Sequence, residues 1–266
     1  MIGASLGLAA RAAGIRVMGW DAAPAHLAEA AERGALDATA ASLDELVERC
    51  DSIAVALPLP ATLALLRRFA ARPPAARLVI DVASLKEPVR AAAGALATFV
   101  GTHPIAGSER SGPGAADGGL FRDRTWTYEA DAAEPARAAA VALILATGAR
   151  PLAIGSVEHD RLVALTSHLP QVVAVALASR LGEALGNPAT AALCGPGARS
   201  MTRLGGSSWT MWEGILAQNG QSIAQEVRSL AHILSEAAEA LQTGRSETLE
   251  PWFAAAALAV SRLNEP

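Results

Sequence analysis

The sequence predicts a two-domain α/β protein, with a doubly wound, mainly parallel sheet over residues 1–155 and an all-helical domain over residues 156–266. The first observation is a regular alternation of short apolar runs with helix-like segments up to about residue 155, which is typical of βαβ units. The second is that no β-type run follows residue 157. The third is composition: 266 residues, 52% hydrophobic and 18% charged, suffice to bury the cores of two such units.

In the first half, β-type runs predict strands at residues 16–21, 52–57, 77–81, 98–103, 126–129 and 150–154. The intervening segments predict helices at residues 4–13, 24–33, 43–49, 61–71, 87–96 and 134–146. In the second half we expect one long helix over 158–185, followed by helices at 189–203, 208–219, 222–242 and 248–263. Apolar stripes on so many helices are suited to burial against a second subunit, so we expect a homodimer.

Composition excludes several classes of function. The net charge is −4 and no run of Lys and Arg is present, which argues against nucleic acid as a partner. Cys50 and Cys194 lack the spacing of a disulfide framework or a zinc site, and His159 and His168 lack the spacing of a metal-binding pair, so no metal is expected. No apolar run has the length of a membrane span and the start has no basic leader, so we expect a cytoplasmic protein without a membrane segment.

The N-terminal residues contain parts of a dinucleotide-binding motif. Gly3 opens an apolar helical segment, and Asp21 ends the next β-type run, where an acid can accept hydrogen bonds from a ribose. No arginine follows Asp21 to receive a 2′-phosphate, which favours NAD over NADP. The first strand and first two glycines of this Rossmann-like motif are missing, so we expect the native chain to begin upstream of Met1. The alternative is that Gly3 only allows close helix packing.

The richest chemical signal is the segment from Gly101 to Gly112, Gly-Thr-His-Pro-Ile-Ala-Gly-Ser-Glu-Arg-Ser-Gly. It places His103 at the end of a predicted strand, the edge at which open α/β sheets bind ligands. Ser84 follows the preceding strand, and parallel topology brings the two side chains together, so Ser84 could orient the imidazole. The alternatives are a structural loop histidine and a serine that caps the next helix.

In the helical half, Thr202-Arg203-Leu204-Gly205-Gly206 lies close to Trp212. Because a guanidinium binds carboxylates in a bidentate manner, Arg203 is a candidate anchor for an acidic substrate. The alternative role for Arg203 is an ordinary surface salt bridge.

Taken together, these motifs resemble those of the prephenate and arogenate dehydrogenases of tyrosine biosynthesis. The resemblance runs through the whole chain, and its order and spacing are specific. It rests on Ile-Gly-x-Ser-Leu at the start, Asp-Val-x-Ser-x-Lys at 81–86, His-Pro-Ile-Ala-Gly-Ser-Glu at 103–109, Gly-Leu-Phe at 119–121, His-Asp at 159–160, Ser-His-Leu-Pro at 167–170, and Thr202-Arg203 with Trp212.

The resemblance implies an NAD-dependent oxidative decarboxylase with its active site between a nucleotide-binding domain and a helical dimerisation domain. His103 would be the catalytic base, oriented by Ser84, while Arg203 would hold a substrate carboxylate and Glu109 would gate the pocket. The resemblance also implies further ligands of the substrate, Ser167, His168, Gln171 and Trp212, and of the cofactor, Gly3, Ser5, Asp21 and Ser84.

Three questions stay open on the sequence. Gln171 stands where many prephenate-using relatives have a histidine, and an amide can bind a keto group or an ammonium, so the substrate is prephenate, arogenate or both. A 3-hydroxyacid dehydrogenase or imine reductase would share the two-domain layout, although no lysine follows Lys86 to serve such an enzyme. The incomplete glycine motif is also compatible with a non-catalytic NAD-binding dimer module.

Overall fold

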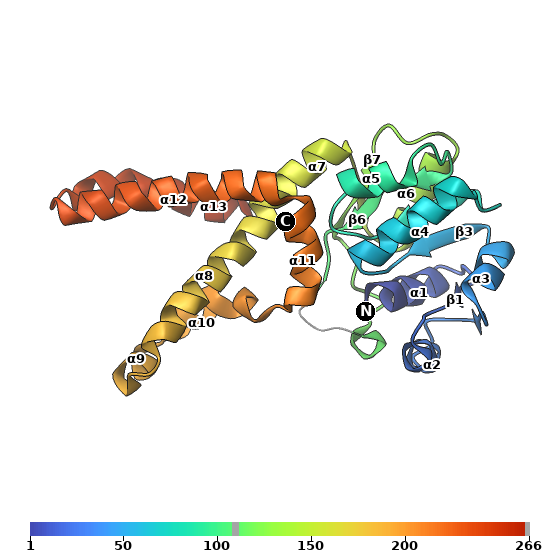
Figure 1. Cartoon of the computed structure of the whole chain (residues 1–266), viewed down its shortest axis with the longest axis horizontal. Coiled ribbons are helices and arrows are strands. Elements are labelled where there is room, and N and C mark those ends of the chain that lie inside the picture. Colours follow the sequence, from blue (N-terminus) through green and yellow to red (C-terminus); the bar gives the residue numbers. More distant parts are fainter. Residues whose placement is uncertain (108–111, 264–266) are drawn as a thin grey trace.

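The computed structural model describes residues 1–107 and 112–263, which form an N-terminal α/β domain and a helical domain (Figure 1). Glu109, the expected gate, lies outside the described residues. The last strand of the first domain ends at Ile154 and the first helix of the second begins at Ser156. This is the architecture that the alternating pattern predicts, a parallel-sheet nucleotide-binding type of domain followed by helices.

The strands of the N-terminal domain are short and lie close to the predicted positions. They are β1 (Met18–Gly19), β2 (Ala38–Thr39), β3 (Ser52–Val55), β4 (Leu78–Asp81), β5 (Phe99–Val100), β6 (Thr102–Pro104), β7 (Thr125–Glu129) and β8 (Arg150–Ile154). The helices of this domain are α1 (Ile2–Ala12), α2 (Pro24–Glu32), α3 (Leu43–Arg49), α4 (Leu59–Ala71), α5 (Glu87–Ala93) and α6 (Ala136–Ala146), with a 3-10 turn η1 (Pro113–Ala115). The two-residue strand β2 has no counterpart among the predicted strands, because Ala-Thr is too short to give a β-type run.

Strand pairing is parallel within β1–β2, within β3–β4–β5 and between β7 and β8. In the described residues no strand pairing joins β1 to β3, so the two groups are separate sheets. The single parallel strand expected at 98–103 is wrong: it breaks at Gly101, and β6 then pairs antiparallel with β7. His103 consequently lies within a short strand and not on the loop beyond one.

The core of the domain lies on both faces of β4, whose four residues are all buried. Val79 packs on one face with Leu66 and Phe69 of α4. Leu78 and Ile80 point to the other face, into a cluster with Trp126 of β7. Because successive side chains of a strand point to opposite faces, helices must cover both, as a doubly wound sheet requires.

The helical domain consists of α7 (Ser156–Val163), the π-helical turn η2 (Ala164–His168), α8 (Leu169–Ala184), α9 (Pro188–Leu193), α10 (Pro196–Thr202), the 3-10 turn η3 (Arg203–Gly206), α11 (Trp209–Gln218), α12 (Gly220–Gln242), the 3-10 turn η4 (Ser246–Leu249) and α13 (Glu250–Leu263). The long helix expected at 158–185 is therefore interrupted by a π turn, and the helix expected at 189–203 is broken before Pro196. Proline at the first position of a helix is favourable, whereas inside one it removes a backbone donor.

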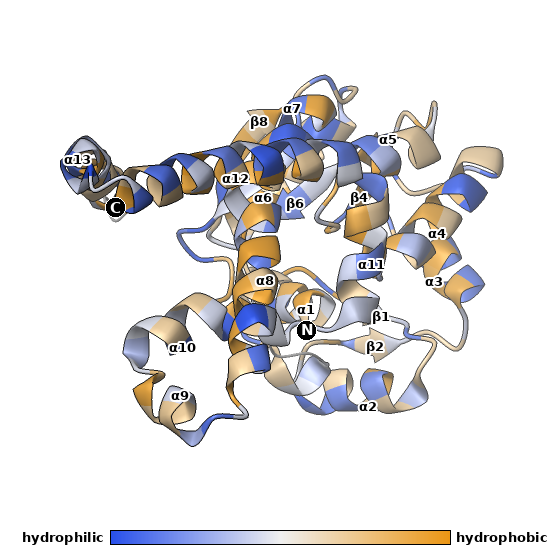
Figure 2. Cartoon of the chain, turned by 60° about the vertical axis from the view of Figure 1, so that its left-hand side comes forward, coloured by the Kyte–Doolittle hydropathy of each residue, from blue (hydrophilic) through white to orange (hydrophobic). Residues whose placement is uncertain are grey.

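Helices α8 and α12 diverge from the domain junction, and hydrophobic residues lie along both (Figures 1 and 2). No residue of α13 is buried, although it includes Trp252 and Phe253. The helical segment Ser156–Ala184, with the π turn included, is long and apolar enough to cross a membrane by length and composition. It also carries the buried polar residues His159, Asp160 and His168 in contact with the rest of the fold, as core helices of folded domains do.

Candidate active site

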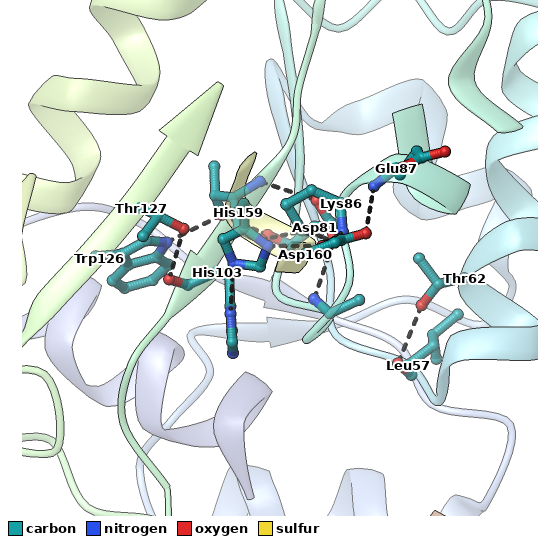
Figure 3. A network of polar contacts seen from close by, with 12 residues as sticks. Leu57, Thr62, Asp81, Lys86, Glu87, His103, Trp126, Thr127, His159 and Asp160 are labelled. Carbon is teal, nitrogen blue, oxygen red and sulfur yellow. Dashed lines mark hydrogen bonds and ion pairs between the residues drawn. The ribbon is translucent and has the colours of Figure 1, made fainter. Parts of the chain in front are cut away.

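The site begins at the carboxyl end of β4, where Asp81 and Lys86 form a buried ion pair (Figure 3). Asp81 Oδ1 accepts a hydrogen bond from the backbone N–H of Thr102 at 3.0 Å, and Lys86 Nζ donates to the carbonyl oxygen of the same residue. The Thr102 hydroxyl donates to the Asp81 carbonyl and accepts from Trp126 Nε1. The ion pair therefore bonds both the N–H and the carbonyl oxygen of Thr102, the residue before His103.

Lys86 is the only lysine in the sequence, against 21 arginines. A lysine ammonium is a compact charge that fits into a small buried space, whereas a guanidinium needs a planar slot. Burial lowers the pKa of Lys86, and the adjacent Asp81 carboxylate opposes this shift. The pair is a structural support for the strand end, because both partners are almost completely buried and also bond the backbone.

His103 contacts a second histidine, which comes from the helical domain. Its Nδ1 lies 3.0 Å from Nε2 of His159, and the two rings meet edge to face. His159 Nδ1 in turn lies 2.7 Å from Asp160 Oδ1. His159 and Asp160 are buried, while His103 is half-buried.

Asp160 also joins the two domains. Its Oδ1 accepts the backbone N–H of Lys86 at 2.7 Å and its Oδ2 that of Glu87 at 2.9 Å, so it caps the N-terminus of α5 from helix α7. A carboxylate at this position satisfies donors that the helix leaves unpaired and interacts favourably with the helix dipole. The adjacent cluster of Leu85 with Val163, Ala164, Ile215 and Ile223 packs across the same junction.

Ser84 is half-buried and lies between Asp81 and Lys86 in the sequence. The partner of His103 Nδ1 is His159, and the orienting contact from Ser84 stays a prediction. The alternative of a serine cap is wrong, because α5 is capped by Asp160 and its N-cap residue is Lys86. Ser84 stays a predicted ligand of the cofactor.

The surroundings of His103 favour its neutral form. Burial lowers its pKa well below the ordinary value, and the positive charge of Lys86 lowers it further. A neutral imidazole has a free lone pair and can accept a proton, which is the state that a general base requires.

His168 and Trp212 lie together behind this cluster. The rings of the two residues meet edge to face at 5.7 Å, and His168 Nδ1 lies 3.4 Å from the amide nitrogen of Asn219. Asn219 also donates to the carbonyl oxygen of Asp160 at 2.8 Å. Among the described residues, Trp212 Nε1 is buried without a hydrogen-bond partner, so a donor remains available at this position.

Three predicted substrate ligands of the helical domain have different surroundings. Gln171 is buried, its Nε2 donates to the Leu204 carbonyl at 2.8 Å, and its Oε1 accepts from Ser207 at 3.3 Å. Each end of its amide thus holds the turn that follows Arg203, and its contact with substrate stays a prediction. Arg203 is exposed at the start of that turn, and Ser167 is exposed on the π turn.

The residues expected to bind a dinucleotide lie around the start of α1. A Cβ on Gly3 would lie 3.0 Å from Ala56, so this glycine allows close packing of the helix on the loop after β3. Burial lowers the pKa of the Met1 amino group, while Asp21 and Glu29 oppose that shift, so Asp21 lies near the positive end of α1. Ser5 is completely buried and accepts the backbone N–H of Asp117, and its contact with the cofactor stays a prediction.

A cavity of about 560 Å³ lies beside the segment that follows His103 and is lined in part by Ile105, Arg122 and Arg124. None of the predicted ligands within the described residues lines it. The polar network of His103, and not this cavity, therefore marks the candidate site. The described residues also contain no group of three or more His, Cys, Asp or Glu arranged to hold a metal ion.

The sequence motifs include Asp81, Lys86, His159 and Asp160 but do not indicate their supporting roles, and Asn219 belongs to none of these motifs. His159-Asp160 stands out as a motif, but its partners lie 56 and 74 residues away in the sequence. A usable signal is the unique lysine five positions after an acid at a predicted strand end.

Protonation of His168 makes stability depend on pH. Burial lowers the pKa of His168 from its ordinary 6.5 to about 4, with Asp160 opposing and His159 adding to the shift. Between about pH 6.5 and pH 4, His168 is protonated in the unfolded chain but neutral in the native state. The free energy of unfolding therefore decreases as the pH is lowered through this range. The loss is on the order of 1–3 kcal/mol.

We expect His168→Gln to remove this contribution. The urea midpoint of the variant is expected to lie below that of the wild type at pH 7.5 and to approach it at pH 5. The reason is that acidification destabilises the wild type through protonation of His168, a residue that the variant lacks. A difference between the two midpoints that stays constant with pH contradicts the assignment.

Models of the prephenate dehydrogenase family match both domains: the nucleotide-binding domain over residues 6–150 and the dimerization domain over residues 155–255. The chain is 33% identical over 251 residues to a protein described as probable prephenate dehydrogenase NovF of Streptomyces niveus, covering 91% of this chain and 67% of that protein. The chain spans about two thirds of the length of the curated relatives that it matches.

Solved structures share the fold over nearly the whole chain. A prephenate dehydrogenase from A. aeolicus in complex with hydroxyphenyl propionate and NAD+ has a TM-score of 0.88 at 21% identity, covering 99% of this chain and 95% of that one. Synechocystis arogenate dehydrogenase has a TM-score of 0.80 at 23% identity, covering 98% and 96%.

Proposed function

The chain belongs to the prephenate dehydrogenase family, and we propose that it catalyses NAD-dependent oxidative decarboxylation of prephenate, arogenate or both, with His103 as the base. The observation that carries the proposal is the match of the family models to both domains, with His103 held at their junction by groups from each. The products are 4-hydroxyphenylpyruvate from prephenate and tyrosine from arogenate.

The chemistry requires orientation, one base and an anchor for a carboxylate. His103 accepts the proton of the ring hydroxyl as the carbon that bears it is oxidised, and loss of carbon dioxide makes the ring aromatic. Arg203 binds a substrate carboxylate. The negative charge of the bound substrate favours the protonated imidazole, which offsets the lowering of its pKa by burial and Lys86.

The residues around α1 fit a dinucleotide in part. NAD+, when bound, accepts the hydride that leaves the substrate ring. Asp21 lies close to the amino end of α1, as an acid that binds the ribose hydroxyls must, and Gly3 allows the close packing that this motif uses. The A. aeolicus relative was solved with NAD+, which supports the same cofactor here.

The competing functions have less support. The family models that match are those of prephenate dehydrogenases over both domains, and the only lysine is buried at the domain junction on the N-terminal side. A reductase that works through a lysine of the helical domain therefore lacks that residue. A non-catalytic module would not need an assembled histidine network, which this chain has.

We place this enzyme in the cytoplasm as a homodimer. The segment that the dimerization model matches extends into α13, which buries none of its residues. Large apolar side chains are exposed throughout the helical domain, among them Leu193, Met201, Trp209, Phe253 and Leu263. Such a surface is typical of a helix bundle completed by a second copy.

The direct test is NADH formation with prephenate and with arogenate, in parallel reactions containing NAD+ or NADP+. We expect NADH to appear with at least one substrate, and carbon dioxide to be released in equal amount. An enzyme that reduces neither cofactor with either substrate, although calorimetry shows that it binds NAD+, contradicts the proposed reaction.

A further inference from the structure

We propose that His159 is a positioning residue for His103, and that Asp160, His159 and His103 form a hydrogen-bonded chain which keeps Nε2 of His103 without a proton. This inference rests on the proposed function, in which His103 is the base. It assigns a role to His159 and Asp160 of the helical domain, which would set the tautomer of the base in the N-terminal domain.

The direction of each hydrogen bond follows from the Asp160 carboxylate at one end of the chain. Asp160 accepts two backbone N–H groups, from Lys86 and Glu87, and an ionised carboxylate can only accept. His159 Nδ1, 2.7 Å from Asp160 Oδ1, must therefore carry the proton of that hydrogen bond. In neutral His159 the other ring nitrogen, Nε2, is then an acceptor.

The next bond in the chain is fixed by the same logic. Because His159 Nε2 accepts, His103 Nδ1, at 3.0 Å, must donate. A neutral imidazole carries one proton, so Nε2 of His103 has the lone pair. This is the tautomer in which Nε2 can accept a proton from a substrate hydroxyl.

The groups around the chain favour this arrangement over a charged one. The Lys86 ammonium, paired with Asp81, binds the carbonyl oxygen of Thr102 next to His103. The positive charge of Lys86, so close to His103, disfavours an imidazolium in the resting enzyme. When His103 takes up a proton, the Asp160 carboxylate at the far end of the chain stabilises the new positive charge through His159.

The chain is also held rigidly. Asp160 is fixed by α5 and by Asn219, which donates to its carbonyl oxygen at 2.8 Å. His159 is 1% exposed, so water does not compete for its ring nitrogens. Both ends of the chain, the Asp160 cap and the clamped Thr102 backbone, are thus set by the fold before substrate binds.

The test combines nitrogen-15 NMR with kinetics on the intact chain. The protein has five histidines, so labelled imidazole nitrogens can be resolved and His103 assigned from the His103→Asn spectrum. At pH 7.5 we expect His103 to show a protonated Nδ1 and an unprotonated Nε2. We expect His159→Leu to lose this pattern and to lower kcat by about 10-fold or more, with little change in KM.

His159→Gln is the matched variant, because its amide oxygen can still accept from His103 Nδ1. We expect it to retain the tautomer and to recover part of the kcat lost in His159→Leu. A purely structural role of His159 predicts that both variants lose thermal stability and that the tautomer of His103 stays the same.

A proton on Nε2 of His103 in the wild type overturns the proposal, as does a folded His159→Leu enzyme with wild-type kcat. If His159→Leu does not fold, the wild-type spectrum and His159→Gln decide. The NMR result does not depend on turnover: the expected tautomer in a protein inactive on both substrates leaves this inference standing and removes the proposed function.

Discussion

Replacing His103 by Asn is expected to lower kcat by about 10²- to 10⁴-fold, the range that a positioned general base contributes. The asparagine amide can hydrogen-bond a ring hydroxyl and can also reach His159, but it cannot take up a proton at neutral pH. The KM for the substrate is expected to change little, because Arg203 and not His103 is assigned to the carboxylate. Steady-state NADH formation measures both constants.

His232→Asn is the matched control for this substitution. His232 lies on α12, is 76% exposed, and among the described residues forms only an i, i+4 pair with Glu236. The same chemical change there is expected to leave kcat unchanged. Turnover by His103→Asn at the wild-type rate, with circular dichroism showing a folded protein, excludes His103 as the base.

The sequence was sufficient to predict the layers of the fold and the neighbourhood of the base. The continuous apolar run that became β4 indicates a strand buried on both faces, and Asp81 to Lys86 follow it at the ligand-binding edge. His103 could be placed beside that edge because sequential βαβ units put their strands side by side.

What pattern reasoning could not give is the partner of His103. Ser84 carries a hydroxyl and follows the strand that precedes the strand of His103. Topology alone therefore favours Ser84 as the hydrogen-bond partner of His103. The actual partner, His159, is brought in by the packing of α7 against α5, which depends on side-chain fit and on the cap that Asp160 makes. Periodicity predicts that α7 is a helix but does not say against which helix end it packs.

The antiparallel strand β6 and the role of Gln171 were missed for the same reason. The residue pattern of an extended segment does not depend on which strand it pairs with. The sequence therefore does not indicate that the pairing changes at Gly101. The resemblance places Gln171 among the substrate ligands, but it does not reveal the hydrogen bonds of its amide with the Leu204 carbonyl and the Ser207 hydroxyl. Only tertiary contacts decide whether a buried amide is satisfied by the protein or by a substrate.

Replacing the single lysine, Lys86→Met, is expected to destabilise the protein by about 3–5 kcal/mol, the effect of removing one partner of a buried ion pair. Methionine is of similar length, so the change removes the charge and the donor while keeping most of the volume. Asp81, which is completely buried, is left without its cation, and the carbonyl of Thr102 loses a hydrogen-bond donor. Urea unfolding at pH 7.5 measures the loss.

Arg180→Met is the control, because Arg180 is 75% exposed and, within the part of the chain that the structure describes, pairs only with Glu183 on the same helix. Its urea midpoint is expected to match that of the wild type, since exposed ion pairs contribute little. Equal midpoints for Lys86→Met and the wild type contradict a supporting role for the buried pair.

The double variant Asp81→Asn with Lys86→Met separates the cost of an unpaired charge from the loss of hydrogen bonds. The amide that replaces the Asp81 carboxylate is neutral, and its carbonyl oxygen could still accept the Thr102 N–H. We therefore expect the double variant to be more stable than Lys86→Met alone, with a coupling energy of about 0.5–3 kcal/mol between the two positions. If the two losses simply add, the stabilisation comes from separate hydrogen bonds to the Thr102 backbone and not from the ion pair.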